Sequence, residues 1–221
     1  MGLLHIFVGM ETLQAIQSLS SQPLTHQVVS SLLRKYKRPN DKVHALLQQG
    51  VLQSVRKGLY VAGPAVGAGR PSSFLLANHI FGPSYVSLDA ALSYYGLIPE
   101  RVFETSSMTT KVGRIFDTPM GRFTYSHLPF PYYAFGIRSI KMADDQYAMV
   151  ASREKALADK LIATSGIIIR SQKGAAEYLL ENLRMDGDQL KTLDTKMMSE
   201  WLPDAPKRES LSLVIKMINN L

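Results

Sequence analysis

A cluster of cations and amide side chains between Arg34 and Lys57 is the part of the sequence best suited to binding chemistry. Residues 1–62 hold seven Lys and Arg against two acids, a net charge of +5, while the remainder of the 221-residue chain supplies +2 of the total of +7. Lysine and arginine neutralise phosphates and release the counterions condensed on nucleic acid. Glutamine, histidine or lysine on an exposed helix can reach base edges in the major groove. The cluster predicts contacts with double-stranded DNA through Arg34, Lys35, Lys37, Arg38, Lys42, His44, Gln48, Arg56 and Lys57.

Two short helices are expected to carry the first part of this cluster. Thr25 can cap the first helix through its hydroxyl, and Pro39 is expected to end it, because the residue before a proline is pushed out of the helical region. The apolar residues of this helix, at the spacings of three and four that mark one helical face, are Val28, Val29, Leu32, Leu33 and Tyr36.

The second helix is expected to start from Asn40 or Asp41 as its N-cap and to end at Gly50, since glycine adopts a positive φ at little cost. This helix has one apolar face and one polar face. Its inward residues are Val43, Leu46 and Leu47, and its outward residues are Lys42, His44, Ala45, Gln48 and Gln49.

Beyond Gly50 the pattern changes to the alternation of strands. Residues 51–55 and 59–61 are expected to pair as a hairpin, with Arg56-Lys57-Gly58 as a basic turn that places glycine at a left-handed position. The order of helix, turn, helix and hairpin is that of a winged helix-turn-helix. A small helical subdomain with a solvated basic face is the alternative for the same residues.

Composition places a break after the hairpin. Residues 63–71 are rich in glycine and contain two prolines, which favours a linker, and no Gly-Lys-Ser/Thr follows that would make a phosphate-binding loop. We therefore expect a winged helix-turn-helix over 1–62, a linker over 63–71 and a C-terminal domain over 72–221. The fold class is expected to be α+β, with a mixed α/β C-terminal domain whose small sheet is flanked by helices.

The C-terminal domain shows alternating helical and strand patterns. Helices are expected over 72–81, 88–95, 152–164, 172–184, 187–197 and 210–221. Strands are expected over 102–109, 114–116, 121–127 and 147–151.

A second basic set is expected on this sheet. Its members are Lys111, Arg114 and Arg122, followed along the chain by Arg138 and Lys141. Aromatic residues interleaved with these cations either stack on bases or form the core of the sheet, and the core is favoured for the phenylalanines. They are Phe116, Phe123, Tyr125, Tyr132 and Tyr133.

Little in the sequence points to catalysis or metal binding. Cysteine is absent, the five histidines are scattered, and no Gly-x-Ser-x-Gly elbow occurs. The pairs Asp144-Asp145 and Asp186/Asp188 could hold a divalent cation, but an acidic turn or helix start is favoured for both. Adjacent Glu154 and Lys155, grouped with Asp117 as in a metal-dependent nuclease, are more simply a solvated pair. No enzyme activity, metal or cofactor is expected.

Localisation is expected to be cytoplasmic, which fits the lack of cysteine. No apolar run is long enough to span a bilayer, so no membrane partner is expected. Residues 1–10 are apolar but lack the basic leader and cleavage site of a signal peptide. Both Met1 and Met10 are compatible with a translation start.

Four segments, in this order along the chain, resemble AbiEi-type antitoxins of type IV toxin–antitoxin systems, which belong to abortive phage-infection modules. The resemblance extends from about Thr25 to Leu161. The segments are Arg56–Val61, Ile80–Pro99, Thr105–His127 and Arg153–Leu161.

The resemblance implies that an N-terminal winged helix binds inverted repeats in the protein's own promoter and represses the operon. It implies that the C-terminal domain counters a cognate nucleotidyltransferase toxin without forming a stable complex. The toxin's own Gly-Ser and Asp-x-Asp signature is absent. Base and wing contacts would fall on Lys42, His44, Gln48, Arg56 and Lys57, and phosphate contacts on Arg34, Lys35, Lys37 and Arg38.

The resulting hypothesis is a DNA-binding antitoxin and transcriptional autorepressor. One alternative is a stand-alone winged-helix regulator whose C-terminal domain senses a ligand or partner. A second alternative is an enzyme, such as a divalent-metal nuclease.

Overall fold

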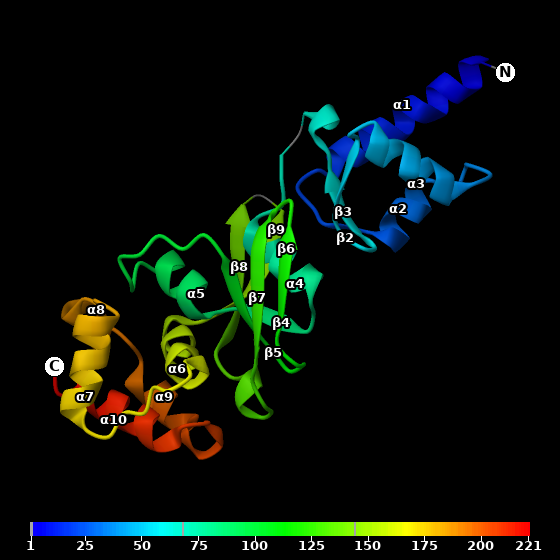
Figure 1. Cartoon of the computed structure of the whole chain (residues 1–221). Coiled ribbons are helices and arrows are strands. Elements are labelled where there is room, and N and C mark those ends of the chain that lie inside the picture. Colours follow the sequence, from blue (N-terminus) through cyan, green and yellow to red (C-terminus); the bar gives the residue numbers. More distant parts are fainter. Residues whose placement is uncertain (1, 68, 144) are drawn as a thin grey trace. The chain divides into compact units, whose positions relative to one another are not determined.

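The computed structural model describes residues 2–67, 69–143 and 145–221, so Ala68 of the expected linker and Asp144 of the first acidic pair lie outside the described residues. The fold is mixed α+β, as expected (Figure 1). The chain divides into two compact units. Unit 1 comprises residues 1–80, 118–120 and 141–147, and unit 2 comprises residues 81–117, 121–140 and 148–221.

The first eighty residues form helices around a small antiparallel sheet. Strand β3 lies between β1 and β2, and it pairs Tyr60 with Leu24 and Ala62 with Leu52. The buried core beneath the sheet includes Ile16, Val29, Leu33, Val43 and Leu46. The elements are α1 (Gly2–Ser18), β1 (Leu24–Thr25), α2 (His26–Leu32), α3 (Pro39–Gln48), β2 (Leu52–Arg56), β3 (Leu59–Ala62), the 3-10 turn η1 (Pro64–Val66) and α4 (Ser73–Ile80).

The start of α2 is confirmed and the start of α3 is corrected. The Thr25 hydroxyl accepts a hydrogen bond from the backbone N–H of Val28 at 3.3 Å, as a capping residue does. Pro39 does not end the preceding helix but opens α3, and Arg38 is its N-cap residue without a side-chain bond, so the prediction of Asn40 or Asp41 was wrong. Proline suits this position because its missing N–H would be unpaired there anyway.

Helix α2 is also shorter than its apolar pattern suggested. It ends at Leu32, and residues 33–38 form the connection to α3. Val29 and Leu33 are buried, but Val28 is 36 % exposed, so it does not belong to the inward face.

The end of the expected linker is held by hydrogen bonds within unit 1. Buried Gln146 accepts a hydrogen bond from the Ser72 backbone N–H at 2.6 Å and donates one to the Arg70 carbonyl at 3.3 Å. Gln22 likewise donates to the Asp145 carbonyl at 2.6 Å. The turn between β8 (Ile137–Ala143) and β9 (Gln146–Ala151) thus lies in the same compact unit as the segment after β3.

A six-stranded mixed sheet dominates the remainder of the chain, with strand order β6-β7-β5-β4-β9-β8. Strands β5 and β7 run parallel, as do β4 and β9, whereas β4 and β5 are antiparallel. The further strands are β4 (Ser84–Val86), β5 (Thr105–Thr109), β6 (Arg114–Thr118) and β7 (Gly121–His127).

Along the chain, helices are interspersed with these strands and follow the last of them (Figure 1). They are α5 (Leu88–Tyr94), α6 (Arg153–Ala163), α7 (Gln172–Ala176), α8 (Gly187–Lys191), α9 (Thr195–Glu200) and α10 (Arg208–Asn219), with a π-helical stretch over Glu177–Asn182 and 3-10 turns over Tyr132–Ala134 and Leu202–Asp204. Strands β4 and β8 were not predicted, because β4 has only three residues and β8 lacks strict alternation of apolar residues.

A buried ion pair lies at the centre of unit 2. Sequence reasoning treated Glu154 and Lys155 as solvated, which is wrong, since they are 9 % and 0 % exposed. The Lys155 ammonium lies 2.9 Å from the Asp159 carboxylate one turn along α6. It also donates to the Tyr132 carbonyl at 3.0 Å and sits 3.5 Å from the centroid of the Tyr132 ring.

The other carboxylate oxygen of Asp159 is also engaged. It accepts hydrogen bonds from the Tyr85 hydroxyl at 2.9 Å and from the Ser87 hydroxyl at 2.8 Å. Burial raises the pKa of Asp159 and lowers that of Lys155, and the attraction between the two groups opposes both shifts. Burial, with the nearby Asp159 carboxylate, raises the pKa of Tyr85, so Tyr85 remains a hydrogen-bond donor.

Lys155→Met should lower the free energy of unfolding of unit 2 by about 3–5 kcal/mol, because Asp159 would remain as an uncompensated buried charge. Combining it with Asp159→Asn removes that charge and keeps an acceptor for Tyr85 and Ser87, so the double variant should be more stable than the single one. Urea unfolding can be followed by the fluorescence of Trp201, the single tryptophan, which is buried in unit 2. A double variant less stable than Lys155→Met would contradict the charge argument.

Candidate nucleic-acid interface

Helix α3 separates apolar from polar side chains. Val43 and Leu46 enter the core of unit 1, and His44 and Gln48, one helical turn apart, are exposed on the other side. Lys42 is half-buried, with its ammonium 5.2 Å from the centroid of the Tyr36 ring. The side chains of His44 and Gln48 are therefore more exposed to solvent than that of Lys42.

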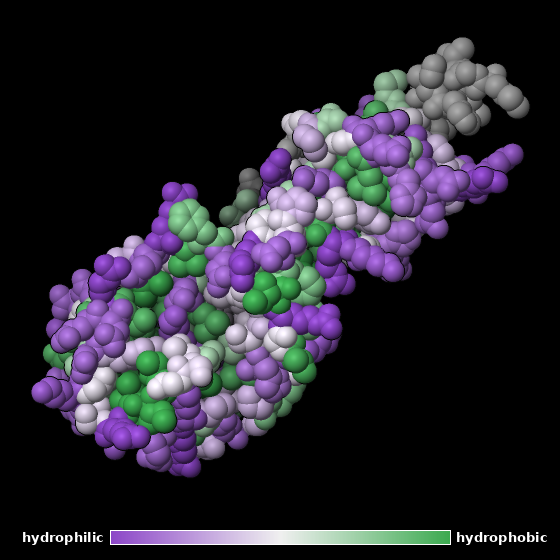
Figure 2. All heavy atoms as spheres, viewed as in Figure 1, coloured by the Kyte–Doolittle hydropathy of each residue, from purple (hydrophilic) through white to green (hydrophobic). Residues whose placement is uncertain are grey.

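The turn between α2 and α3 presents four exposed cations. Lys35 pairs with Glu11 of α1 at 2.9 Å, and Arg38 lies 3.7 Å from Asp41 of α3. Both pairs are largely solvent-exposed, and such pairs are worth at most about 1 kcal/mol. The side chains of Arg34 and Lys37 have no hydrogen bond or ion pair with any residue that the structure describes. Figure 2 shows hydrophilic side chains covering this turn.

The two cations of the hairpin differ in their surroundings. Arg56 donates a hydrogen bond from its guanidinium to the carbonyl of Ile80. Lys57 is exposed and pairs with nothing in the described part of the chain. Gly58 has a φ of +80°, and its carbonyl accepts a hydrogen bond from the His26 N–H at 2.8 Å. The turn is thus the left-handed glycine turn that the sequence predicted, and one of its two cations also supports the fold.

The second basic set is engaged in contacts within unit 2. The Lys111 ammonium donates to the Gly82 carbonyl and lies 5.2 Å from the centroid of the Phe81 ring. The Arg114 guanidinium is 5.8 Å from the same ring. Arg122 lies 3.5 Å from Glu104 and 3.7 Å from Asp117. These contacts reduce the charge that the set can offer to phosphates.

Most of the aromatic residues considered for base stacking are in the core, which the sequence favoured for the phenylalanines and left open for the tyrosines. Phe123, Tyr125, Tyr132 and Tyr133 are buried, and Phe116 is half-buried. The Tyr125 ring packs against those of Phe81 and Phe116, with centroids 5.3 and 5.7 Å away. The four buried rings are therefore not free to stack on bases.

Most of the described residues considered for metal or nuclease chemistry have structural partners. Lys155 is committed to Asp159, and Asp117 lies beside Arg122. Asp186 caps α8, accepting a hydrogen bond from the Asp188 N–H at 2.7 Å. In residues 2–67, 69–143 and 145–221, no three His, Asp or Glu side chains are grouped so that they could hold a metal ion. Over the same residues, no helix has both the length and the apolar character needed to cross a membrane.

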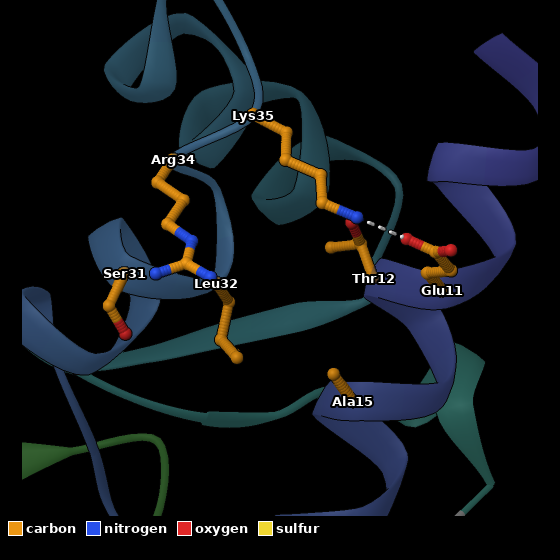
Figure 3. Close-up of a pocket in the computed structure, with 7 residues that line it drawn as sticks. All are labelled: Glu11, Thr12, Ala15, Ser31, Leu32, Arg34 and Lys35. Carbon is orange, nitrogen blue, oxygen red and sulfur yellow. Dashed lines mark hydrogen bonds and ion pairs between the residues drawn. The ribbon is translucent and has the colours of Figure 1, made fainter. Parts of the chain in front are cut away.

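One feature near the interface carried no signal in the sequence. A pocket of about 370 Å³ lies between α1 and the end of α2, all within unit 1 (Figure 3). Sequence reasoning did not predict α1 and so could not place its residues opposite the basic turn. The pocket is lined by Glu11, Thr12, Ala15, Ser31, Leu32, Arg34 and Lys35.

Comparison with known proteins gives a likeness of fold. No protein-family model and no curated protein matches the chain. A solved structure, the RV2827C protein from Mycobacterium tuberculosis, is similar with a TM-score of 0.64 and 12 % sequence identity, over 96 % of this chain and 77 % of that chain. At this identity the likeness concerns the fold alone.

Arg56→Ala should lower the free energy of unfolding of unit 1 by about 1–2 kcal/mol, because the Ile80 carbonyl loses a charged donor. Lys57→Ala removes the same charge from the adjacent residue without removing a hydrogen bond, so it should change stability by less than about 0.5 kcal/mol. Urea unfolding followed by circular dichroism would compare the two. Equal effects of both substitutions would rule out a structural role for the Arg56 bond.

Proposed function

We propose that residues 1–62 form a winged helix-turn-helix that binds double-stranded DNA sequence-specifically. The observation that carries this proposal is the exposed face of α3, which presents His44 and Gln48 to solvent. The basic α2–α3 turn precedes this helix along the chain, and the exposed Lys57 follows it at the hairpin tip. A helix of this kind fits the major groove, and the flanking cations fit the phosphates on either side of it. The net charge of +5 on residues 1–62 supports the same partner.

The side chains suggest a division of roles. Gln48 can bind the N6 and N7 positions of adenine with two hydrogen bonds, and His44 can donate to or accept from a neighbouring base. Lys37, Arg38 and Lys57 supply sequence-independent attraction to phosphates. Arg56 contributes charge and also holds the hairpin against Ile80.

We further propose that the chain is an antitoxin and autorepressor of a type IV toxin–antitoxin operon. The support is the resemblance of four ordered segments to AbiEi-type antitoxins. The operator would then be inverted repeats in the protein's own promoter, with half-sites about one helical turn apart for two copies of the chain. The functional partner would be a nucleotidyltransferase toxin that forms no stable complex with it.

Gln48→Ala and Lys57→Ala should weaken DNA binding in different ways. Loss of Gln48 should cost about 1–3 kcal/mol at the operator and little on a scrambled duplex, because base contacts carry the specificity. Loss of Lys57 should weaken both duplexes equally and reduce the slope of log K against log salt by about one. Fluorescence anisotropy across a salt series measures both quantities, with the upstream region of the gene as operator. Absence of any preference for that region in the wild-type chain would refute specific binding.

Antitoxin activity should separate from repression. A full-length chain carrying Lys57→Gln and Gln48→Ala should lose promoter repression, yet still rescue growth when the neighbouring nucleotidyltransferase is expressed from an independent promoter. Both substitutions are at exposed positions, so the fold should be preserved. Failure of the wild-type chain to rescue growth would leave the stand-alone regulator as the function.

A further inference from the structure

The pocket between α1 and the α2–α3 turn contains an arginine whose side chain has no internal partner. The Arg34 guanidinium forms no hydrogen bond or ion pair with the residues that the structure describes. Figure 3 shows its guanidinium directed toward Ser31 and Leu32, away from the ion pair of Lys35 and Glu11. A guanidinium presents a planar fork of donors that matches a phosphate. Arg34 is therefore an available anion-binding group at the wall of the pocket.

The second cation of the pocket is occupied by an acid that an incoming anion can replace. The Lys35 ammonium lies 2.9 Å from the Glu11 carboxylate, and the side chains are 61 % and 58 % exposed. Ion pairs with this much exposure contribute little to stability, because water competes for both charges. The terminal phosphate of a nucleotide carries about −1.5 to −2 at pH 7, more than the carboxylate of Glu11, so it would compete well for Lys35. A phosphate of the DNA backbone carries a single charge, and it would compete through the summed field of its neighbouring phosphates. With two cations and one acid, the lining carries a net positive charge.

The remaining walls suit a nucleoside attached to the phosphate. Leu32 and Ala15 supply apolar contact. The Ser31 hydroxyl donates to the Val28 carbonyl at 2.8 Å, which leaves its oxygen free to accept a hydrogen bond from a sugar hydroxyl. A volume of about 370 Å³ is within the range of small-molecule sites in proteins.

We propose that this pocket binds a nucleotide phosphate through Arg34 and Lys35, and that Glu11 competes with the phosphate for Lys35. The phosphate comes from one of two sources, a free nucleotide or the backbone of bound DNA. The DNA source rests on the function proposed above, whereas the free-nucleotide source does not. A free nucleotide at this pocket would remove two cations from the DNA-binding unit and so would regulate it.

The nucleotide source is tested by titrating the full-length, 15N-labelled chain with adenosine 5′-monophosphate, with adenosine as the control that lacks phosphate. Amide shifts should concentrate at residues 11–15 and 31–35 and should require the phosphate. Arg34→Gln should abolish them. Glu11→Gln should tighten binding roughly two- to fivefold, the range expected from releasing an exposed ion pair. Lys196→Gln removes one exposed charge from α9 and controls for net charge.

The DNA source is tested with the same variants and a duplex of the upstream region. Arg34→Gln should weaken binding, and Glu11→Gln should tighten it and steepen the salt dependence by about one unit of slope. If the two variants change the binding of only one ligand, that ligand is the source of the phosphate. If they change the binding of both, the nucleotide competes with DNA for the pocket. If neither Arg34→Gln nor Glu11→Gln changes the binding of either ligand, the proposal of a phosphate site in this pocket is refuted. If the wild-type chain binds the nucleotide but no DNA, the phosphate site is supported and the proposed function is refuted. If the chain binds DNA specifically and neither ligand responds to Arg34→Gln, the proposed function is supported and the phosphate site is refuted.

Discussion

The burial of one ammonium group organises the larger unit of the protein. Removing Lys155 from water is costly, and the cost is offset only where the charge is paired and its donors are satisfied. The partners of Lys155 come from separate segments. Asp159 lies on α6 itself, and the carbonyl and ring of Tyr132 belong to the turn before β8. Asp159 is held in turn by Tyr85 of β4 and by Ser87 at the start of α5. Segments distant in sequence must therefore come together for the charge to be buried at all.

Close packing around the buried Lys155 side chain also restricts the backbone at Gly136. Gly136 has a φ of +62°, and a Cβ added there would lie 2.8 Å from the Lys155 Cβ and 2.9 Å from the Trp201 ring. Only glycine combines this conformation with this closeness. Unit 1 differs from unit 2, because its core is apolar and its charged side chains are at the surface. Unit 2 thus holds a charge pair in its interior, whereas unit 1 keeps its charges at the surface, where the side chains of Arg34, Lys37 and Lys57 have no partner among the described residues.

The sequence predicts the elements that depend on local rules and misses those that depend on tertiary contacts. The Thr25 cap, the polar face of α3, the Gly58 turn and strand β7 follow from side-chain type and spacing alone. Strand β4 is three residues long and is stabilised by its neighbours, so no local pattern reveals it. The burial of Lys155, the bond from Arg56 to Ile80 and the placing of Glu11 opposite Lys35 involve residues that are polar by type. Residues of these types are predicted to be exposed to solvent, and the partners that bury or engage them become known only from the fold.

Positive charge alone would give the proposed interface affinity without selectivity, because every duplex presents the same phosphates. In the proposed interface, the side chains of α3 would provide the base contacts that the cations cannot make. Asp41 is exposed on this helix one turn before His44, and a carboxylate is repelled by the DNA backbone but can accept a hydrogen bond from the N4 amino group of cytosine. Its neighbour Arg38, 3.7 Å away, would lower this repulsion and so let the first turn of α3 approach a duplex. In the proposed complex, an acid at this position would therefore restrict the orientations that α3 can take in the groove, and would favour those that direct Asp41 toward bases and Arg38 toward phosphate.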